Sequence, residues 1–261
     1  MKGRVLVIAG SDSGGGAGIQ ADIKTITALG GFAATAITAL TAQNTEAVFE
    51  IMPVPPAFVR RQMDAVLSDI GADCIKTGML VDAGIIEAVG DGLPAGVPLV
   101  VDPVMVASTG RRLLDERAIE SLKRRLIARA RVVTPNAPEA EVLTGVALAT
   151  LDDMRRAADI LLELGAAAVV MKGGHVAGDI VRDLVIDGGA SLVLEAPRIV
   201  TRATHGTGCT LASAIATGLA QGLAFRAAVE RAHGYLQRAI ATAPVIGRGH
   251  GPLNHAHTVK D

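Results

Sequence analysis

The chain has 261 residues, of which 50% are hydrophobic and 20% charged, and its net charge at pH 7 is −1. This composition excludes a disordered chain, and the balanced charge excludes a global field that would recruit nucleic acid or an acidic membrane surface. Two cysteines cannot form a disulfide framework, and no Cys/His cluster has the spacing of a zinc site. The first apolar run, at residues 5–9, is too short for a signal peptide or a membrane span. We therefore expect a soluble, cytoplasmic protein.

Short apolar runs alternate with longer helical patterns along the whole chain. In chain order, strands are predicted at 5–10, 74–78, 98–105, 131–136 and 167–172, and helical patterns at 18–30, 56–69, 82–93, 115–130 and 154–165. Residues 183–189 and 191–200 have the pattern of a hairpin, and two helices follow at 210–222 and 224–243.

Buried strands that are each followed by a helix predict an α/β fold, with a mainly parallel sheet flanked by helices on both faces. Ligands of such sheets bind at the carboxyl ends of the strands. Polar and glycine-rich segments stand at these ends: SDSGGGAG (11–18), KTGM, DPVM, TPNAPE and MKGGH. No linker, low-complexity segment or internal repeat divides the chain, so we expect a single domain over residues 1–261.

The segment SDSGGGAG has the glycines of a phosphate loop but lacks the Lys-Ser/Thr of a P-loop. It is equally compatible with a backbone-lined pocket floor, which a ligand could approach closely, and with a tight turn between a strand and a helix. Asp22, one turn into the following helix, could face a ligand or only interact with the helix dipole.

The segment GTGCTLASA is the better candidate for an anion site. The amide N–H groups of Thr207, Gly208 and Cys209 lie where a helix begins and has no intrahelical acceptors for them. Gly206 and Gly208 keep Cβ atoms out of the way. A thiol at a helix N-terminus is expected to have a lowered pKa, which favours a functional Cys209 over a helix start with a passive buried cysteine.

Four further residues stand at strand ends. Asp102 ends an apolar strand, where a carboxylate is costly unless a metal or another partner compensates it. Asn136 and Glu139 could supply oxygen ligands to Mg²⁺, but capping of the next helix explains them at least as well. Lys172 could reach a phosphate or be solvated. An anion hole, a lysine and carboxylates are together typical of phosphoryl transfer, and without a P-loop the kinase would have another fold.

The motifs IAGSDSGGGAGIQADIKT, ITALTAQNT, KTGML, VVDPVMVAS, VTPNAPEAEVL, VMKGGH, THGTGCTLASAIA and GRGHGPLNH occur in this order along the chain. In these motifs the chain closely resembles the hydroxymethylpyrimidine/phosphomethylpyrimidine kinases of thiamine biosynthesis, in the ribokinase superfamily. The resemblance implies a ribokinase-like fold, ATP and Mg²⁺, a homodimer, and two successive phosphorylations. The acceptors would be 4-amino-5-hydroxymethyl-2-methylpyrimidine and then its monophosphate.

The resemblance also implies roles for single residues. The pyrimidine pocket would contain Asp22, Gln43 and Met79, with backbone near Ala17 and Val106. A carboxamide at Gln43 suits an aminopyrimidine edge because it offers one donor and one acceptor.

The resemblance places the phosphates and the metal at the other strand ends. Cys209 takes the place of the aspartate base of related sugar kinases, and the amides at 206–209 would hold the transferring phosphoryl group. Lys172, Thr207 and Gly208 would bind phosphates, whereas Asp102, Asn136 and Glu139 fall in the magnesium and nucleotide region.

Three positions depart from the usual family pattern. Ser108 replaces a lysine and Arg111 an acid in the flap MVASTGRR, and Ala203 replaces an asparagine before the anion hole.

Two other functions stay open. The first alternative is a pyridoxal kinase of the same superfamily, but the carboxamide of Gln43 favours an aminopyrimidine over pyridoxal. The second is a pyrimidine-binding sensor without catalysis.

Overall fold

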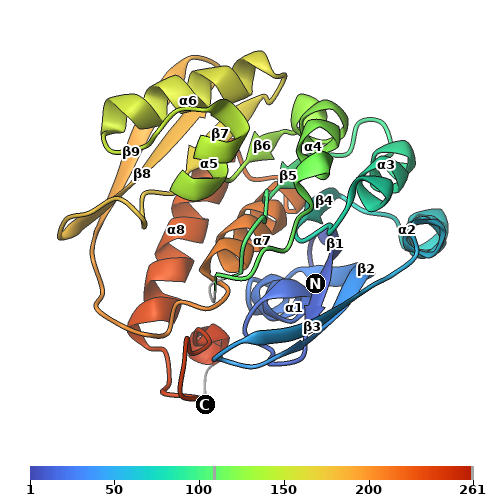
Figure 1. The fold of residues 1–261 in the computed structure, drawn as a ribbon, viewed down its shortest axis with the longest axis horizontal. Helices are drawn as coiled ribbons and strands as arrows, with labels where there is room; N and C mark the ends of the chain where they lie inside the picture. The colour runs from blue at the N-terminus through green and yellow to red at the C-terminus, as the bar shows by residue number, and fades with distance from the viewer. Residues whose placement is uncertain (108–109, 260–261) are drawn as a thin grey trace.

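Figure 1 shows a computed structural model of the chain, which describes residues 1–107 and 110–259. Its centre is a nine-stranded sheet in the order β3-β2-β1-β4-β5-β6-β7-β8-β9. The strands are β1 (Arg4–Asp12), β2 (Phe32–Gln43), β3 (Val48–Pro53), β4 (Cys74–Thr77), β5 (Leu99–Val101), β6 (Val132–Val133), β7 (Ala168–Met171), β8 (Ile180–Asp187) and β9 (Ala190–Pro197). The six neighbouring strands β2, β1, β4, β5, β6 and β7 are mutually parallel. At one edge β3 pairs antiparallel with β2, and at the other β8 pairs antiparallel with β7 and β9 with β8.

Apolar side chains on both faces explain why the central strands are buried. In β1, residues 5–8 are all completely buried, as expected for a parallel strand covered on both sides. The hairpin predicted for residues 183–200 is confirmed by β8 and β9, which pair from Ile180–Pro197 to Asp187–Ala190.

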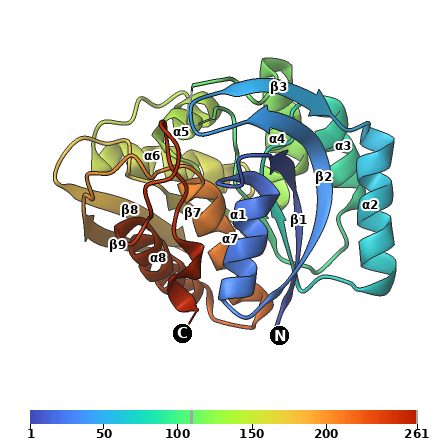
Figure 2. The same ribbon diagram turned by 90° about the horizontal axis from the view of Figure 1, so that it is seen from below.

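Helices cover both faces of the sheet and form two hydrophobic cores (Figure 2). One face carries α1 (Gly18–Ala28), α7 (Thr207–Ala220) and α8 (Phe225–Ala241). The other carries α2 (Pro56–Asp69), α3 (Ala83–Gly92), α4 (Ile119–Arg125), α5 (Ala137–Thr144) and α6 (Leu151–Glu163). The predicted α/β architecture with helices on both faces is therefore confirmed.

The continuous helix predicted over residues 115–130 is wrong. The α-helix there is α4, seven residues long, between the 3₁₀ turns η1 (Glu116–Ala118) and η2 (Ile127–Arg129). The break lies at Leu126, where φ is −117°, outside the range of regular helix. Leu126 and Ile127 are both completely buried, so the bend lets two consecutive apolar side chains reach the core.

The C-terminal segment returns to the carboxyl ends of the strands. The His250 amide donates to the Thr45 carbonyl oxygen at 2.7 Å, and the His205 amide donates to Gly251 O at 3.1 Å. Farther on, His255 in the 3₁₀ turn η3 (His255–Thr258) is buried beside Thr25 and Tyr235. Across the described residues, no helix is both long and apolar enough to cross a membrane.

Candidate active site

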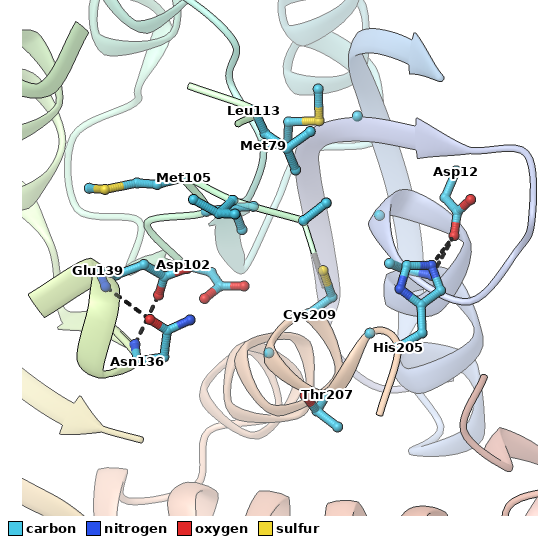
Figure 3. A pocket seen from close by; sticks show the side chains of 18 of the residues that line it. Asp12, Met79, Asp102, Met105, Leu113, Asn136, Glu139, His205, Thr207 and Cys209 are labelled. Atoms are coloured by element: carbon cyan, nitrogen blue, oxygen red, sulfur yellow. Dashed lines mark hydrogen bonds and ion pairs between the residues drawn. The ribbon is translucent and has the colours of Figure 1, made fainter. Parts of the chain in front are cut away.

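A cavity of about 510 Å³ lies along the carboxyl ends of the parallel strands. Six neighbouring strands, in the order β2, β1, β4, β5, β6 and β7, each contribute a lining residue at or just after the strand end: Gln43, Asp12, Met79, Asp102, Asn136 and Lys172. Figure 3 shows Asp102, Asn136 and Glu139 on one side of this cavity and Asp12 and His205 on the other. Cys209 lies between the two groups. The cavity lies where the predicted sheet arrangement places a ligand site.

The N-terminus of α7 opens into the cavity. Gly206 is its N-cap residue, with φ 85°, and a Cβ there would collide with the Gly16 carbonyl oxygen. Only glycine allows this close approach of two loops. Thr207, Gly208 and Cys209 follow in the first turn and line the cavity. A helix N-terminus presents amide donors and a partial positive charge, so this wall of the cavity suits an anion.

Lys172 is held beside that helix by two carboxylates. Its ammonium donates to Asp102 Oδ1 at 2.9 Å and lies 3.7 Å from Glu139 Oε2. A Cβ placed on Gly208 would be 3.0 Å from Lys172 Nζ, so the lysine and the helix N-terminus face the same space. Burial lowers the pKa of Lys172, but the attraction of Asp102 and Glu139 outweighs it and the pKa is raised. The ammonium is therefore charged at neutral pH.

Asn136 and Glu139 form the predicted capping box of α5. The Asn136 side chain accepts from the Glu139 amide at 2.9 Å, and the Glu139 carboxylate accepts from the Asn136 amide at the same distance. Burial raises the pKa of Glu139 to about 7, Lys172 opposes this shift, and Asp102 adds to it. Both residues also line the cavity, so helix capping does not remove them from the candidate site.

The carboxylates of Asp102 and Glu139 fit a Mg²⁺ site that substrate phosphates and water would complete. Asp102 Oδ2 is buried, and in the described part of the chain no hydrogen-bond partner reaches it. Among the same residues, no group of three or more His, Cys, Asp or Glu side chains could hold a metal. Mg²⁺ commonly takes one or two carboxylates, several waters and substrate phosphates rather than an all-protein cage, and Asp102 with Glu139 supplies such a partial donor set.

The lowered pKa expected for Cys209 is wrong. Burial raises the pKa of its thiol to about 12, the Asp22 and Asp102 carboxylates add to the rise, and Lys76 and the Gly18 amide only partly oppose it. The position at a helix N-terminus does not compensate for the loss of water around the sulfur. At neutral pH Cys209 is therefore a thiol and not a thiolate.

Asp22, which the resemblance places in the pyrimidine pocket, lies behind the cavity wall. Its carboxylate is completely buried, accepts from Lys76 Nζ at 2.9 and 3.0 Å and from Ser213 Oγ at 2.6 Å, and is not among the cavity-lining residues. We did not expect a role for Lys76, although a lysine in a buried strand requires an anionic partner.

The glycine-rich loop at 11–18 is both a tight turn and part of the cavity wall. The Asp12 carboxylate accepts from the amides of Gly14 (2.8 Å), Gly16 (3.0 Å) and Ala17 (2.8 Å). His205 Nε2 lies 2.8 Å from Asp12 Oδ2 (Figure 3). Burial raises the pKa of Asp12, but the hydrogen bonds from His205 and the loop amides outweigh it, and the pKa is lowered.

Neither Asp12 nor His205 was expected from the sequence to have a function. An aspartate between a buried strand and a run of glycines, whose free amides require an acceptor, is the signal that could have identified Asp12. No comparable sequence signal exists for His205, because 193 positions separate it from Asp12.

The remaining expected pocket residues lie around this network. Ala17, Met79 and Val106 line the cavity, and the Thr38 hydroxyl fixes the Met79 carbonyl at 2.6 Å. Of the positions that depart from the family pattern, Arg111 donates from Nη1 to the Val48 carbonyl oxygen at 3.2 Å. Ala203 is buried, and Ser108 lies outside the described residues.

The fold and the site together define the class of protein. A parallel α/β sheet whose strand ends bring together a helix N-terminus, a buried lysine and two carboxylates is typical of a ribokinase-like kinase. The chain belongs to the phosphomethylpyrimidine kinase family, because the model of that family matches residues 12–254.

Relatives and solved structures agree with this family. The chain is 49% identical to the hydroxymethylpyrimidine/phosphomethylpyrimidine kinase of Rhizobium meliloti, over 97% of this chain and 96% of that protein. It is also 54% identical to the thiamine biosynthesis bifunctional protein ThiED of Geobacter sulfurreducens. That match covers 100% of this chain, which spans 54% of the length of the longer ThiED protein. The pyridoxal kinase of Staphylococcus aureus in complex with ADP superposes with a TM-score of 0.92 at 35% identity, over 100% of this chain and 96% of that one.

Proposed function

We propose that this protein transfers the γ-phosphoryl group of ATP to 4-amino-5-hydroxymethyl-2-methylpyrimidine and then to the monophosphate formed, supplying the pyrimidine half of thiamine. The observation that carries the proposal is one cavity with an anion site at one end and the Gln43 carboxamide at the other. The Rhizobium meliloti relative, nearly equal in length, is named for both phosphorylations.

In the first reaction the hydroxymethyl oxygen attacks the γ-phosphorus in line, the bond from phosphorus to the ADP oxygen breaks, and the hydroxyl proton passes to an oxygen of the transferred phosphoryl group. The amides at 206–209 hold the transferring phosphoryl group, and the charged Lys172 neutralises part of its negative charge. Such transition states are loose, so catalysis depends mainly on positioning and charge stabilisation. Removal of one such preorganised donor typically slows an enzyme by about 10²–10³-fold.

Asp102 and Glu139 are the residues that would hold Mg²⁺, with Asn136 beside them. When bound, the ion would supply positive charge that stabilises the negative charge developing during transfer. Lys172, which contacts both carboxylates, keeps them in place.

Cys209 borders the substrate hydroxyl in this arrangement, and its raised pKa favours positioning over proton abstraction. A thiol with a pKa of about 12 has almost no thiolate at neutral pH, and a loose transition state needs little base assistance. In the second reaction the acceptor is already a phosphate anion, so no alcohol proton has to leave.

Pyridoxal phosphorylation is the second candidate, and the close superposition on the Staphylococcus aureus pyridoxal kinase favours it. Pyridoxal lacks the amino-pyrimidine edge that suits a carboxamide such as Gln43. We therefore expect kcat/KM for hydroxymethylpyrimidine to exceed that for pyridoxal.

One experiment tests the proposal. Purified protein is incubated with ATP, Mg²⁺ and hydroxymethylpyrimidine, and the mono- and diphosphate are followed by mass spectrometry, with pyridoxal in a parallel reaction. Formation of both pyrimidine phosphates is expected. Pyrimidine binding by calorimetry without ATP turnover would contradict the proposal and indicate a sensor, and faster turnover of pyridoxal would favour the second candidate.

A homodimer in the cytoplasm is also part of the proposal. Leu40 and Met52 are paired across β2 and β3 and are 42% and 57% exposed. Because β3 is also an edge strand, this apolar pair supports association with a second copy.

A further inference from the structure

His205 connects the loop aspartate to the pyrimidine end of the cavity. Its Nε2 lies 2.8 Å from Asp12 Oδ2 and 3.2 Å from the Gln43 carboxamide nitrogen. The other end of that carboxamide, Oε1, lies 3.1 Å from Thr41 Oγ1. Asp12, Thr41 and His205 are each less than 10% exposed, so water does not readily replace these contacts.

The hydrogen bonds that Asp12 accepts determine which ring nitrogen of His205 carries a proton. A carboxylate that already accepts three amide hydrogen bonds is anionic and can only accept. His205 Nε2 must therefore carry a proton, because an unprotonated nitrogen would place a lone pair against the carboxylate. The Nε2–H group is a donor toward Asp12 and also toward whatever atom of Gln43 faces it.

This proton has a consequence for Gln43. With the amide nitrogen toward His205, two donors face each other, which is unfavourable in a buried site. A turn of the carboxamide by 180° leaves both heavy-atom distances in place and brings its oxygen to the His205 donor. The amide nitrogen then donates to Thr41 Oγ1, whose own proton goes to the Ser11 carbonyl oxygen 3.0 Å away. Each of these three contacts then joins a donor to an acceptor.

We propose that Asp12 and His205 are positioning residues that set the orientation of the Gln43 carboxamide and thereby the order of donor and acceptor the cavity accepts. The inference rests on the proposed function. The free amide proton and the free oxygen lone pair of Gln43 face the ligand in a fixed order. The proposed substrate presents an aminopyrimidine edge, with an acceptor nitrogen beside an amino donor, so we assign the matching order to the site. The corresponding 4-oxo pyrimidine reverses it and would require the carboxamide to turn against the His205 donor.

The test compares kcat/KM for hydroxymethylpyrimidine and for its 4-oxo analogue. Leaving one buried donor unsatisfied weakens an interaction enough to change this ratio by about 10–100-fold. We expect His205→Leu to lower the amino-to-oxo ratio by this factor, mainly through KM. Asp12→Asn, which lets His205 shift its proton, should lower the ratio in the same direction.

Two matched controls separate orientation from general damage. His205→Gln keeps an N–H donor and should retain most of the discrimination. His250→Leu removes another cavity-lining histidine, whose Nδ1 contacts the Thr204 hydroxyl, and should leave the ratio unchanged. An unchanged ratio in both His205→Leu and Asp12→Asn would overturn the proposal.

A readout that needs no turnover distinguishes failure of this inference from failure of the proposed function. The ¹⁵N resonances of the His205 ring in the wild-type protein should show a protonated Nε2, and an unprotonated Nε2 would overturn the inference whatever the substrate. If the wild-type protein turned over neither pyrimidine, the proposed function would fail, and the Nε2 resonance alone would then decide the inference.

Discussion

The reactivity of Cys209 tests whether burial or the helix N-terminus controls the pKa of its thiol. The structure raises its pKa from 9.0 to about 12, which lowers the thiolate population below pH 9 by about 1000-fold. A more basic thiolate is also more nucleophilic, which restores about 20-fold of the rate. The expected net effect is alkylation about 50-fold slower than that of an ordinary exposed thiol.

The assay is competitive alkylation with light and heavy iodoacetamide near neutral pH, followed by mass spectrometry of the tryptic peptides. A synthetic peptide of residues 204–214 supplies the exposed reference thiol. Cys74, which is completely buried and whose pKa is also raised by burial, should react more slowly still. Labelling of Cys209 as fast as the peptide, or faster, would refute the reasoning and show that the helix N-terminus dominates.

Four further outcomes are expected. Lys172→Met should lower kcat/KM by about 10²–10³-fold in steady-state assays, and an unchanged value would remove the lysine from phosphoryl transfer. Cys209→Ala should lower kcat by about 10-fold or less for the alcohol, whose hydroxyl the thiol positions, and by less for the monophosphate, which has no such hydroxyl; equal losses would argue against positioning of the alcohol by Cys209. Because burial raises the pKa of Glu139 from 4.5 to about 7, the folded protein holds a proton between these pH values that the unfolded chain has released. The free energy of unfolding that this proton contributes is lost as pH rises through this window. Urea unfolding from about pH 5 to pH 8 should therefore show wild type losing stability relative to Glu139→Gln, and parallel curves would contradict the shift. Met52→Asp should shift the sedimentation mass from dimer to monomer, and a dimer that persists would place the interface elsewhere.

The sequence by itself determined the layered architecture and several residues of the cavity. Apolar runs such as residues 5–8 can be buried only in a sheet covered on both faces, and parallel strands bring their carboxyl ends to one edge. Asp102, Asn136 and Lys172 follow three neighbouring strands, so their placement around one cavity followed from their positions after the strands. The capping box of Asn136 and Glu139 was also predictable, because its hydrogen bonds are local.

The tertiary structure alone decided which groups share a low-dielectric space. The pKa of Cys209 depends on its burial and on Asp22, Asp102 and Lys76, none of which a local helix-start argument includes. Asp22 meets Lys76 across 54 positions, and Asp12 meets His205 across 193. Such contacts depend on the complete packing of α1 and α7 against the sheet. Local sequence patterns predict helix caps and strands because those interactions are local, whereas desolvation and long-range pairing are set by the whole fold.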